Sequence, residues 1–288
     1  MRLAVVGDPV AHSLSPAMQE AGLRAAGLGG RYLALRVERG RLAERAAELE
    51  AEGFLGLNVT MPLKEEALAL ARRRSRRALR AGAANTLVRL PEGGWAAENT
   101  DVEAVAGALA ERGWRPGPAL VLGAGGAAGA AAVALGELGA PRVRLLNHHA
   151  GRAERLAARM RAHFPATRWE AASWSEAGGV GQAGAPEGWS LLVQATPLAM
   201  EGVGAGYPLP PEELAAALAP GGWVVELVYR PPRTPLLEAA SARGLGVVDG
   251  VELLLRQGAA SFELWTGREA PREAMRRALE EVLGCSAG

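Results

Sequence analysis

Lys64 is the only lysine among the 288 residues, and the other 31 of the 32 Lys and Arg positions hold arginine. A lysine amine gives up a proton far more readily than a guanidinium does. A position that keeps lysine in an arginine-rich chain is therefore a candidate for acid–base chemistry. Chance survival of one lysine during a drift in composition is the alternative interpretation.

The residues around Lys64 predict a strand that leads into a helix. Phe54 to Thr60 is a short apolar run typical of a buried strand, and Pro62 suits the first position of a helix that we expect to reach about Arg80. Lys64 then lies in the first turn, at the end of the helix dipole that disfavours a cation. Local violations of this kind are expected at functional sites.

Asp101 is a second candidate for the same chemistry. It is one of only three aspartates, and it follows Asn99 and Thr100 at the end of a predicted hairpin strand. Thr100 and Glu103 have the spacing of a capping box for a helix from Val102 to about Arg112. Asp101 is then either a first-turn acid favoured by the helix dipole or a carboxylate that reaches Lys64.

Other polar residues lie where binding sites are usually built. All four asparagines stand at predicted strand ends, where they either tolerate a turn or contact a ligand: Asn58, Asn85, Asn99 and Asn147. Ser15 and Pro16 predict the start of a helix that reaches about Gly27, with Ser15 as its cap. Together with Ser13, Ser15 could also hold a small anion such as a carboxylate at this helix start.

The second half of the chain opens with a glycine turn. Residues 119–122 form a buried strand, and a helix runs from the turn to Leu138. The turn Gly123-Ala124-Gly125-Gly126-Ala127-Ala128 fits the G-x-G-x-x-A pattern, in which backbone N–H groups receive a dinucleotide pyrophosphate. A further strand over 143–146 lies at the spacing this interpretation needs.

The end of that further strand bears on the cofactor. An NAD site usually has an acidic residue there for the ribose hydroxyls, whereas this chain has Asn147-His148-His149 followed by Arg152. Absence of an acid and presence of cations favour NADP, with Arg152 facing the 2′-phosphate. The two histidines could equally be loop residues.

Alternating strands and helices beyond residue 118 predict a doubly wound parallel sheet. Predicted helices include 211–219 and 251–264, and a glycine-rich surface loop covers 178–188. We expect two domains: 1–101 with 251–288 as a mixed α/β substrate domain, and 102–250 as a Rossmann domain that binds NADP, with a cleft between them.

Composition excludes several classes of protein. The formal net charge of +1 gives no global attraction to nucleic acid or membrane, and the six arginines between Arg72 and Arg80 predict a solvated helix face because no aromatic residue lies among them. The single cysteine, Cys285, excludes internal disulfides and fits a reducing cytoplasm. The uncharged stretch 116–136 contains six glycines and two prolines, which disfavours a membrane span.

The motifs together resemble those of the shikimate dehydrogenase family, in order and over nearly the whole chain. They are Ser13-Leu14-Ser15-Pro16, Asn58-Val59-Thr60-Met61-Pro62-Leu63-Lys64, Gly82-Ala83-Ala84-Asn85-Thr86, Asn99-Thr100-Asp101, Gly123-Ala124-Gly125-Gly126-Ala127 and Gln257.

The resemblance implies a cytoplasmic, NADP-dependent enzyme, monomeric or homodimeric and without a metal, that reduces 3-dehydroshikimate to shikimate. It implies that Lys64 and Asp101 are catalytic. It also implies a set of substrate-binding residues: Ser13, Ser15, Asn58, Thr60, Lys64, Asn85, Asp101, Tyr229 and Gln257. The cofactor would be held by the 123–128 turn with Asn147, His148, Arg152 and Thr196.

Two departures from the family pattern keep alternatives open. The family usually reads Asn-Arg-Thr where this chain has Asn147-His148-His149, and Asn-Ala-Thr-x-x-Gly-Met where it has Gln194 to Met200. The first departure lends weight to a related enzyme that acts on quinate with NAD. The other alternative is a non-catalytic sensor that binds NADP(H), against which the retained Lys64 and Asp101 argue.

Overall fold

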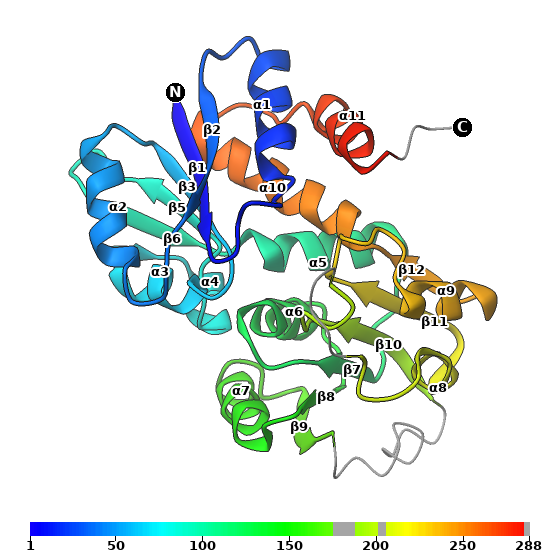
Figure 1. The fold of residues 1–288 in the computed structure, drawn as a ribbon. Helices are drawn as coiled ribbons and strands as arrows, with labels where there is room; N and C mark the ends of the chain where they lie inside the picture. The colour runs from blue at the N-terminus through cyan, green and yellow to red at the C-terminus, as the bar shows by residue number, and fades with distance from the viewer. Residues whose placement is uncertain (175–187, 201–205, 285–288) are drawn as a thin grey trace. The chain divides into compact units, whose positions relative to one another are not determined.

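The computed structural model describes residues 1–174, 188–200 and 206–284 (Figure 1). Most of the glycine-rich loop predicted over 178–188, and Cys285, lie outside these ranges. The chain forms two compact units: unit 1 comprises Met1–Glu103 and Leu254–Gly288, and unit 2 comprises Ala104–Leu253. Within the described ranges, no helix is long and apolar enough to cross a membrane.

Unit 1 is built on a six-stranded mixed sheet in the order β2-β1-β3-β5-β6-β4. The strands β1, β2 and β3 are parallel to one another, whereas β5 is antiparallel to its neighbours β3 and β6. Their bounds are β1 Arg2–Gly7, β2 Arg31–Arg36, β3 Gly56–Val59, β4 Arg73–Arg74, β5 Thr86–Arg89 and β6 Trp95–Glu98.

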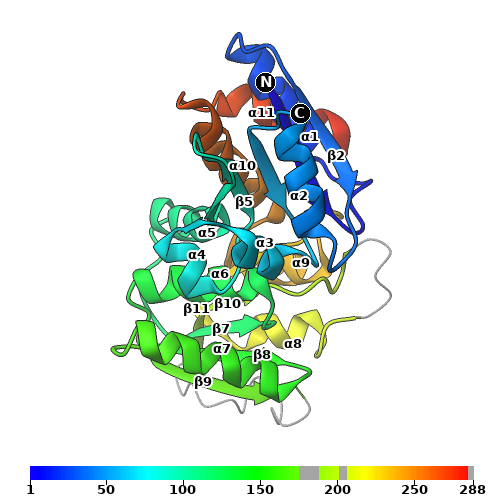
Figure 2. The same cartoon turned by 90° about the vertical axis from the view of Figure 1, so that its left-hand side faces the viewer.

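Helices cover both faces of this sheet. In Figure 1, α2 lies on the left of the strands while α1 and α10 lie on the right, and Figure 2 shows α2 and α3 in front. The bounds are α1 Ser15–Ala25, α2 Leu42–Ala51, α3 Lys64–Leu70, α4 Arg76–Ala81, α10 Gly250–Thr266 and α11 Arg272–Leu283. The boundary between the units falls within α5, Thr100–Glu111, and within α10.

Strand alternation decides which side chains of β3 meet which helix. Leu57 and Val59 belong to the core that α2 and α3 complete, so Asn58 points to the opposite face, toward α10. On that face Trp265 of α10 donates its indole N–H to the Leu87 carbonyl at 3.1 Å. A Cβ at Gly56 would collide with the same indole. Glycine at 56 therefore lets α10 approach the sheet.

The single helix predicted from Pro62 to Arg80 is wrong, because the structure divides it. Helix α3 ends at Leu70, the chain becomes extended at Ala71, and β4 pairs with β6 before α4 begins. Ser75 caps α4 by accepting the Ala78 N–H at 3.1 Å. Pairing of β4 with the edge of β6, together with the Ser75 cap, is more favourable here than one continuous helix through residues 71–75.

The arginines of this region are used individually rather than as one helix face. The Arg73 guanidinium pairs with Glu92 at 2.6 Å, and that of Arg74 donates to the Ala69 carbonyl at 2.8 Å. Both residues are exposed. The prediction of solvated cations holds at these two positions, although the predicted helix face does not form there.

Unit 2 confirms the doubly wound parallel sheet. All six strands are parallel, in the order β12-β11-β10-β7-β8-β9. This is the strand order of a Rossmann fold. The bounds are β7 Ala119–Leu122, β8 Arg142–Asn147, β9 Arg168–Ser173, β10 Trp189–Gln194, β11 Leu218–Glu226 and β12 Gly246–Val248.

Four helices pack on this sheet: α6 Gly126–Glu137, α7 Ala150–His163, α8 Pro211–Ala216 and α9 Pro235–Ala242. Leu214 of α8 and Leu236 of α9 share a core with Leu120, Leu192 and Val224 of the strands. The helix predicted over 211–219 is too long by three residues, because Leu218 already pairs with Trp189 as the first residue of β11.

Candidate active site

The structure brings Lys64 and Asp101 together. Lys64 is the first residue of α3 and Asp101 lies in the first turn of α5, yet Lys64 Nζ donates to Asp101 Oδ2 at 2.6 Å. The two side chains are 18% and 16% exposed. The ion pair is thus sheltered but still reachable by a small molecule. The Ala84 N–H donates to the Lys64 carbonyl at 2.8 Å, which anchors the helix start from which the amine extends.

Asn85 fixes the carboxylate of this pair. Its side-chain Nδ2 donates to Asp101 Oδ1 at 2.8 Å and to Thr100 Oγ1 at 2.9 Å, while its Oδ1 accepts the Thr100 N–H at 2.8 Å. An amide has only two N–H donors, so these bonds use both. Asp101 therefore meets Lys64 with one oxygen and Asn85 with the other.

Asn58 lies in a buried extension of the same network. Its Nδ2 donates to Thr86 Oγ1 at 3.2 Å and to Ser261 Oγ at 2.9 Å. Its Oδ1 accepts the Tyr32 hydroxyl at 2.7 Å. Burial raises the pKa of Tyr32 well above its ordinary value, and a side-chain hydrogen bond with Ser15 opposes that rise. Tyr32 therefore joins Asn58 to Ser15 as a neutral hydroxyl.

Sequence reasoning missed four members of this network: Tyr32, Thr86, Thr100 and Ser261. Thr86 and Ser261 are fully buried, and their hydroxyls lie 2.8 Å apart. One signal was available for Ser261. It follows Gln257 by four residues, so both lie on one face of a helix. No comparable signal marks Tyr32, since a buried tyrosine in a strand is ordinary core material.

Two predicted helix caps are wrong. The Ser15 side chain caps nothing; instead Ser13 Oγ accepts the Ser15 N–H at 3.3 Å, and α1 begins at Ser15 itself. The capping box of Thr100 and Glu103 is replaced by Asn99, whose Oδ1 accepts the Val102 N–H at 3.4 Å. The Thr100 hydroxyl is unavailable for capping because it belongs to the Asn85 network.

The remaining candidates of unit 1 lie at the edges of this network. Gln257 Oε1 lies 3.4 Å from Asn85 Nδ2, whose donors are better used elsewhere, so this oxygen retains acceptor capacity. Thr60 is half-buried just beyond β3 and packs against Gly7, where a Cβ would collide with it. Ser13 is half-buried before α1.

In unit 2 the glycine turn lies between β7 and α6. Gly123 has φ 115°, a conformation that L side chains avoid, and a Cβ there would lie 2.9 Å from the Ala195 carbonyl. Gly125 precedes α6, is exposed, and would have nothing within 4 Å of an added Cβ. The backbone of this turn is therefore open to a ligand beside a helix N-terminus.

Asn147 ends β8, next to that turn. It is 6% exposed, and its Nδ2 donates to the His149 carbonyl at 3.1 Å. His148 and His149 are exposed, with ring centroids 3.8 Å apart and ring planes tilted by 45°, and the centroid of the Trp174 ring lies 5.5 Å from that of His148. Arg152 is exposed in the first turn of α7. These residues offer donors, a cation and aromatic surface to an anionic nucleotide.

Thr196 follows β10, and Tyr229 follows β11. The Thr196 hydroxyl donates to Gln194 Oε1 at 2.7 Å and accepts the Leu198 N–H at 3.2 Å, so it holds its own turn together. Tyr229 is half-buried three residues after β11.

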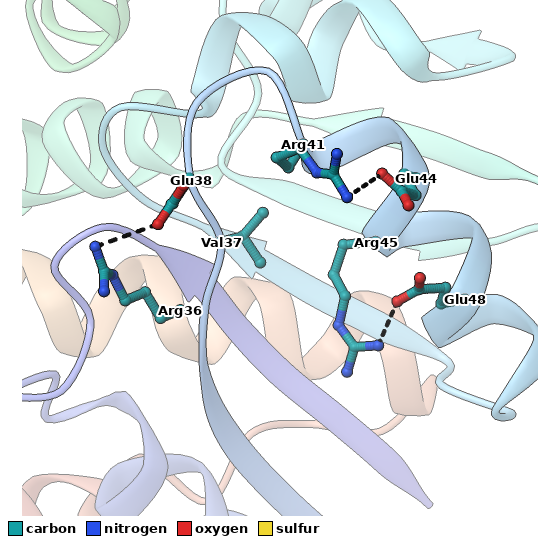
Figure 3. A pocket seen from close by; sticks show the side chains of 7 residues that line it. All are labelled: Arg36, Val37, Glu38, Arg41, Glu44, Arg45 and Glu48. Atoms are coloured by element: carbon teal, nitrogen blue, oxygen red, sulfur yellow. Dashed lines mark hydrogen bonds and ion pairs between the residues drawn. The ribbon is translucent and has the colours of Figure 1, made fainter.

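A separate pocket on unit 1 lacks the properties of a catalytic site (Figure 3). Its wall consists of Val37 and charged residues whose cations are paired, with Arg41 at 2.7 Å from Glu44 and Arg45 at 2.6 Å from Glu48. Arg36 likewise pairs with Asp8 and Glu38. These charges are largely satisfied by one another, which leaves little to attract a ligand.

The network around Lys64 has the parts that acid–base chemistry on a polar molecule needs. An amine held by a carboxylate can pass a proton to or from an oxygen within hydrogen-bond reach. Hydroxyls and amides lie around it to orient such a molecule. Unit 2 adds a turn suited to a dinucleotide.

Two family models match the chain. The model described as shikimate dehydrogenase substrate binding domain matches residues 5–87, and the model described as shikimate 5′-dehydrogenase C-terminal domain matches residues 250–280. The shikimate dehydrogenase (NADP(+)) of Moorella thermoacetica is 40% identical over 292 residues, which covers 99% of this chain and 95% of that protein.

Solved structures are similar along the whole chain. Shikimate 5-dehydrogenase from Thermus thermophilus, in complex with NADP(H) and shikimate, has 39% identity and a TM-score of 0.83, covering 98% of this chain and 100% of that one. Quinate dehydrogenase from Corynebacterium glutamicum, in complex with NAD, has 28% identity and a TM-score of 0.84, covering 98% and 99%.

Proposed function

The chain belongs to the shikimate dehydrogenase family, and from this premise we propose that it interconverts 3-dehydroshikimate and shikimate through an acid–base pair of Lys64 and Asp101. It is an NADP-dependent oxidoreductase, as its relatives are. The observation that carries the proposal is the 2.6 Å contact between the lone lysine and Asp101. We also propose a place for it in the cytoplasmic route to chorismate and the aromatic amino acids.

Lys64 is the proton donor and acceptor for the substrate oxygen at ring carbon C3. In reduction of the ketone, this oxygen gains negative charge and takes a proton from the ammonium group; in oxidation the amine takes the hydroxyl proton back. Asp101 keeps the ammonium in place with one oxygen, while its other oxygen is held by Asn85.

The carboxylate of the substrate and its ring hydroxyls would bind different residues of the protein. Ser13 and Ser15 would hold the carboxylate, because their hydroxyls lie at the start of α1, where the helix dipole favours an anion. The ring hydroxyls would bond to amide, hydroxyl and carboxylate groups near Lys64, namely those of Asn58, Thr60, Asn85, Asp101 and Gln257. The Tyr229 hydroxyl would be a further partner. Orientation by several such bonds restricts the substrate to a reactive geometry.

Unit 2 fits NADP(H) with residues of its own. The open backbone at Gly125 would receive the pyrophosphate, with the rest of the 123–128 turn around it. Asn147, His148 and Arg152 would hold the adenosine 2′-phosphate, and the Thr196 turn would lie near the nicotinamide. When bound, NADP(H) supplies or accepts the hydride. The proposed division is thus unit 1 for the substrate, apart from Tyr229, and unit 2 for the cofactor.

A second candidate function is oxidation of quinate with NAD. The observation in its favour is the His148-His149 pair, which offers less fixed positive charge to a 2′-phosphate than an arginine would. The similarity to a quinate dehydrogenase in complex with NAD supports the same candidate.

One assay decides between these candidates. The purified chain is given shikimate or quinate with NADP or NAD, in all four combinations, and formation of reduced nicotinamide is followed by its absorbance. We expect the highest kcat/KM with shikimate and NADP. Highest kcat/KM with quinate and NAD would favour the second candidate, and binding of NADP without turnover of either substrate would indicate a sensor.

A further inference from the structure

Glu226 is a buried acidic residue that the proposed proton transfer does not use. It is the last residue of β11 and is completely shielded from solvent. A buried carboxyl group requires hydrogen-bond partners to offset its lost hydration. Its partners therefore indicate what the carboxyl group does in the fold.

Three segments of unit 2 donate to this carboxyl group. Oε1 accepts the Val228 N–H at 3.0 Å, and Oε2 accepts the Thr234 hydroxyl at 3.2 Å and the Tyr207 hydroxyl at 3.3 Å. Thr234 also caps α9, since its hydroxyl accepts the Leu237 N–H at 3.3 Å. One side chain thus ties the turn after β11 to the start of α9 and to the segment around Tyr207.

The neighbouring strand β10 also ends in a buried polar side chain. Gln194 ends β10 and is the register partner of Glu226. Its side chain folds back in the same way, accepting the Thr196 N–H at 2.8 Å and donating to the Leu198 carbonyl at 3.0 Å. Two buried polar side chains therefore shape two adjacent loops at the carboxyl edge of the sheet, where ligands of such folds bind.

The loop shaped by Glu226 carries Tyr229. We propose that Glu226 is a positioning residue, whose carboxylate fixes the turn that presents Tyr229 and thereby strengthens substrate binding without taking part in the chemistry. This rests on the proposed function, in which Tyr229 contacts the substrate. Val228, whose N–H donates to the carboxylate, directly precedes Tyr229.

The charged form of Glu226 suits this role better than the neutral form. A carboxylate accepts all three bonds, whereas a carboxylic acid carries a hydrogen of its own, so the Tyr207 or Thr234 hydroxyl would have to accept that hydrogen instead of donating to Glu226. The 3.3 Å bond from Tyr207 is the longest and the easiest to lose. Protonation is expected to loosen the turn.

Both forms exist near neutral pH. Burial raises the pKa of Glu226 to about 7, and the hydrogen bonds from Val228, Thr234, Tyr207 and the Leu227 N–H oppose that rise. Substrate affinity should therefore change with the ionisation of Glu226 around pH 7.

Glu226→Gln tests the proposal, because glutamine has the size of glutamate but does not ionise near neutral pH. In the wild type, KM for shikimate should be roughly threefold to tenfold higher at about pH 6 than at about pH 8.5. This ratio corresponds to the net free energy of one hydrogen bond. In Glu226→Gln, KM should be high at both pH values and kcat close to wild type. The affinity for shikimate, measured calorimetrically without cofactor, should follow the same pattern.

Two further variants separate positioning from mere stability. Glu238→Gln, the same change at an exposed position of α9, should keep the wild-type profile. Tyr207→Phe removes one donor to the carboxylate, so the inflection of KM should move to higher pH. An unmoved inflection in Tyr207→Phe, or wild-type KM values in Glu226→Gln at both pH values, would overturn the proposal. Wild-type enzyme inactive toward shikimate would instead refute the proposed function.

Discussion

Asn85 holds the Asp101 carboxylate through a 2.8 Å hydrogen bond from its side-chain amide. The amide is itself fixed, because its oxygen accepts the Thr100 N–H. Asp101 Oδ2 remains for Lys64. The position of the lysine amine is therefore set by groups at the start of strand β5 and the start of helix α5.

Lys64→Ala should lower kcat for shikimate oxidation by at least ~100-fold, because the amine proposed to exchange the proton is lost. The dissociation constant for NADPH, measured by fluorescence titration, should stay near that of the wild type. Lys64→Arg is the matched control: it keeps the charge beside Asp101 but holds its proton at all working pH values, so it should be almost as slow. Wild-type turnover in either variant would remove Lys64 from the mechanism.

Tyr32→Phe should raise KM for shikimate roughly threefold to tenfold and leave kcat nearly unchanged. The substitution keeps the ring but deprives the buried Asn58 oxygen of its 2.7 Å donor and breaks the link to Ser15. Both neighbours are proposed to bind substrate and neither transfers the proton. KM for NADPH in the same variant serves as the internal control. A fall in kcat with constant KM for shikimate would contradict this role.

Local signals marked Lys64 and Asp101, since each lies at a strand end or helix start, but their contact was one of two alternatives for Asp101 until the family resemblance implied a catalytic pair. The glycine turn was predictable from local signals, as its strand, turn and helix are consecutive in the chain. The prediction of the glycine turn required no knowledge of how distant elements pack, whereas the contact between Lys64 and Asp101 depends on how α3 and α5 lie relative to each other.

Tyr32 and Ser261 were not predictable, because their meeting with Asn58 depends on packing between segments far apart in the sequence. It requires α10 to lie on one face of the sheet and β2 to present Tyr32 to that same face. The division of the helix predicted to Arg80 has a similar cause. The backbones of Arg73 and Arg74 pair with those of Ala96 and Ala97 in β6, and no pattern within the helix-like stretch predicts that partner strand.

Arg152→Ala should raise KM for NADPH about tenfold or more and change KM for NADH little, because the lost cation is proposed to face the 2′-phosphate that only NADPH carries. Arg159→Ala, an exposed arginine farther along α7, is the matched control and should leave both values unchanged. Parallel increases for NADPH and NADH in Arg152→Ala would show that the residue acts on the fold or on the shared part of the cofactor.

Glu226 should also make stability depend on pH, in the opposite sense to its effect on substrate affinity. Its pKa is about 7 in the folded protein against an ordinary value of 4.5, so the folded chain binds the proton more tightly than the unfolded chain. The contribution is complete below pH 4.5 and is lost as pH rises through 7. The expected loss is about 3 kcal/mol, from roughly 1.4 kcal/mol for each unit of pKa difference.

Urea unfolding of the full chain between about pH 5 and pH 8 measures this loss. The free energy of unfolding should fall more steeply with pH for the wild type than for Glu226→Gln, because glutamine has no proton to release over that range. Glu238→Gln should resemble the wild type, since Glu238 is exposed on α9. Equal slopes for all three proteins would mean that Glu226 titrates in the folded chain as it does in the unfolded one.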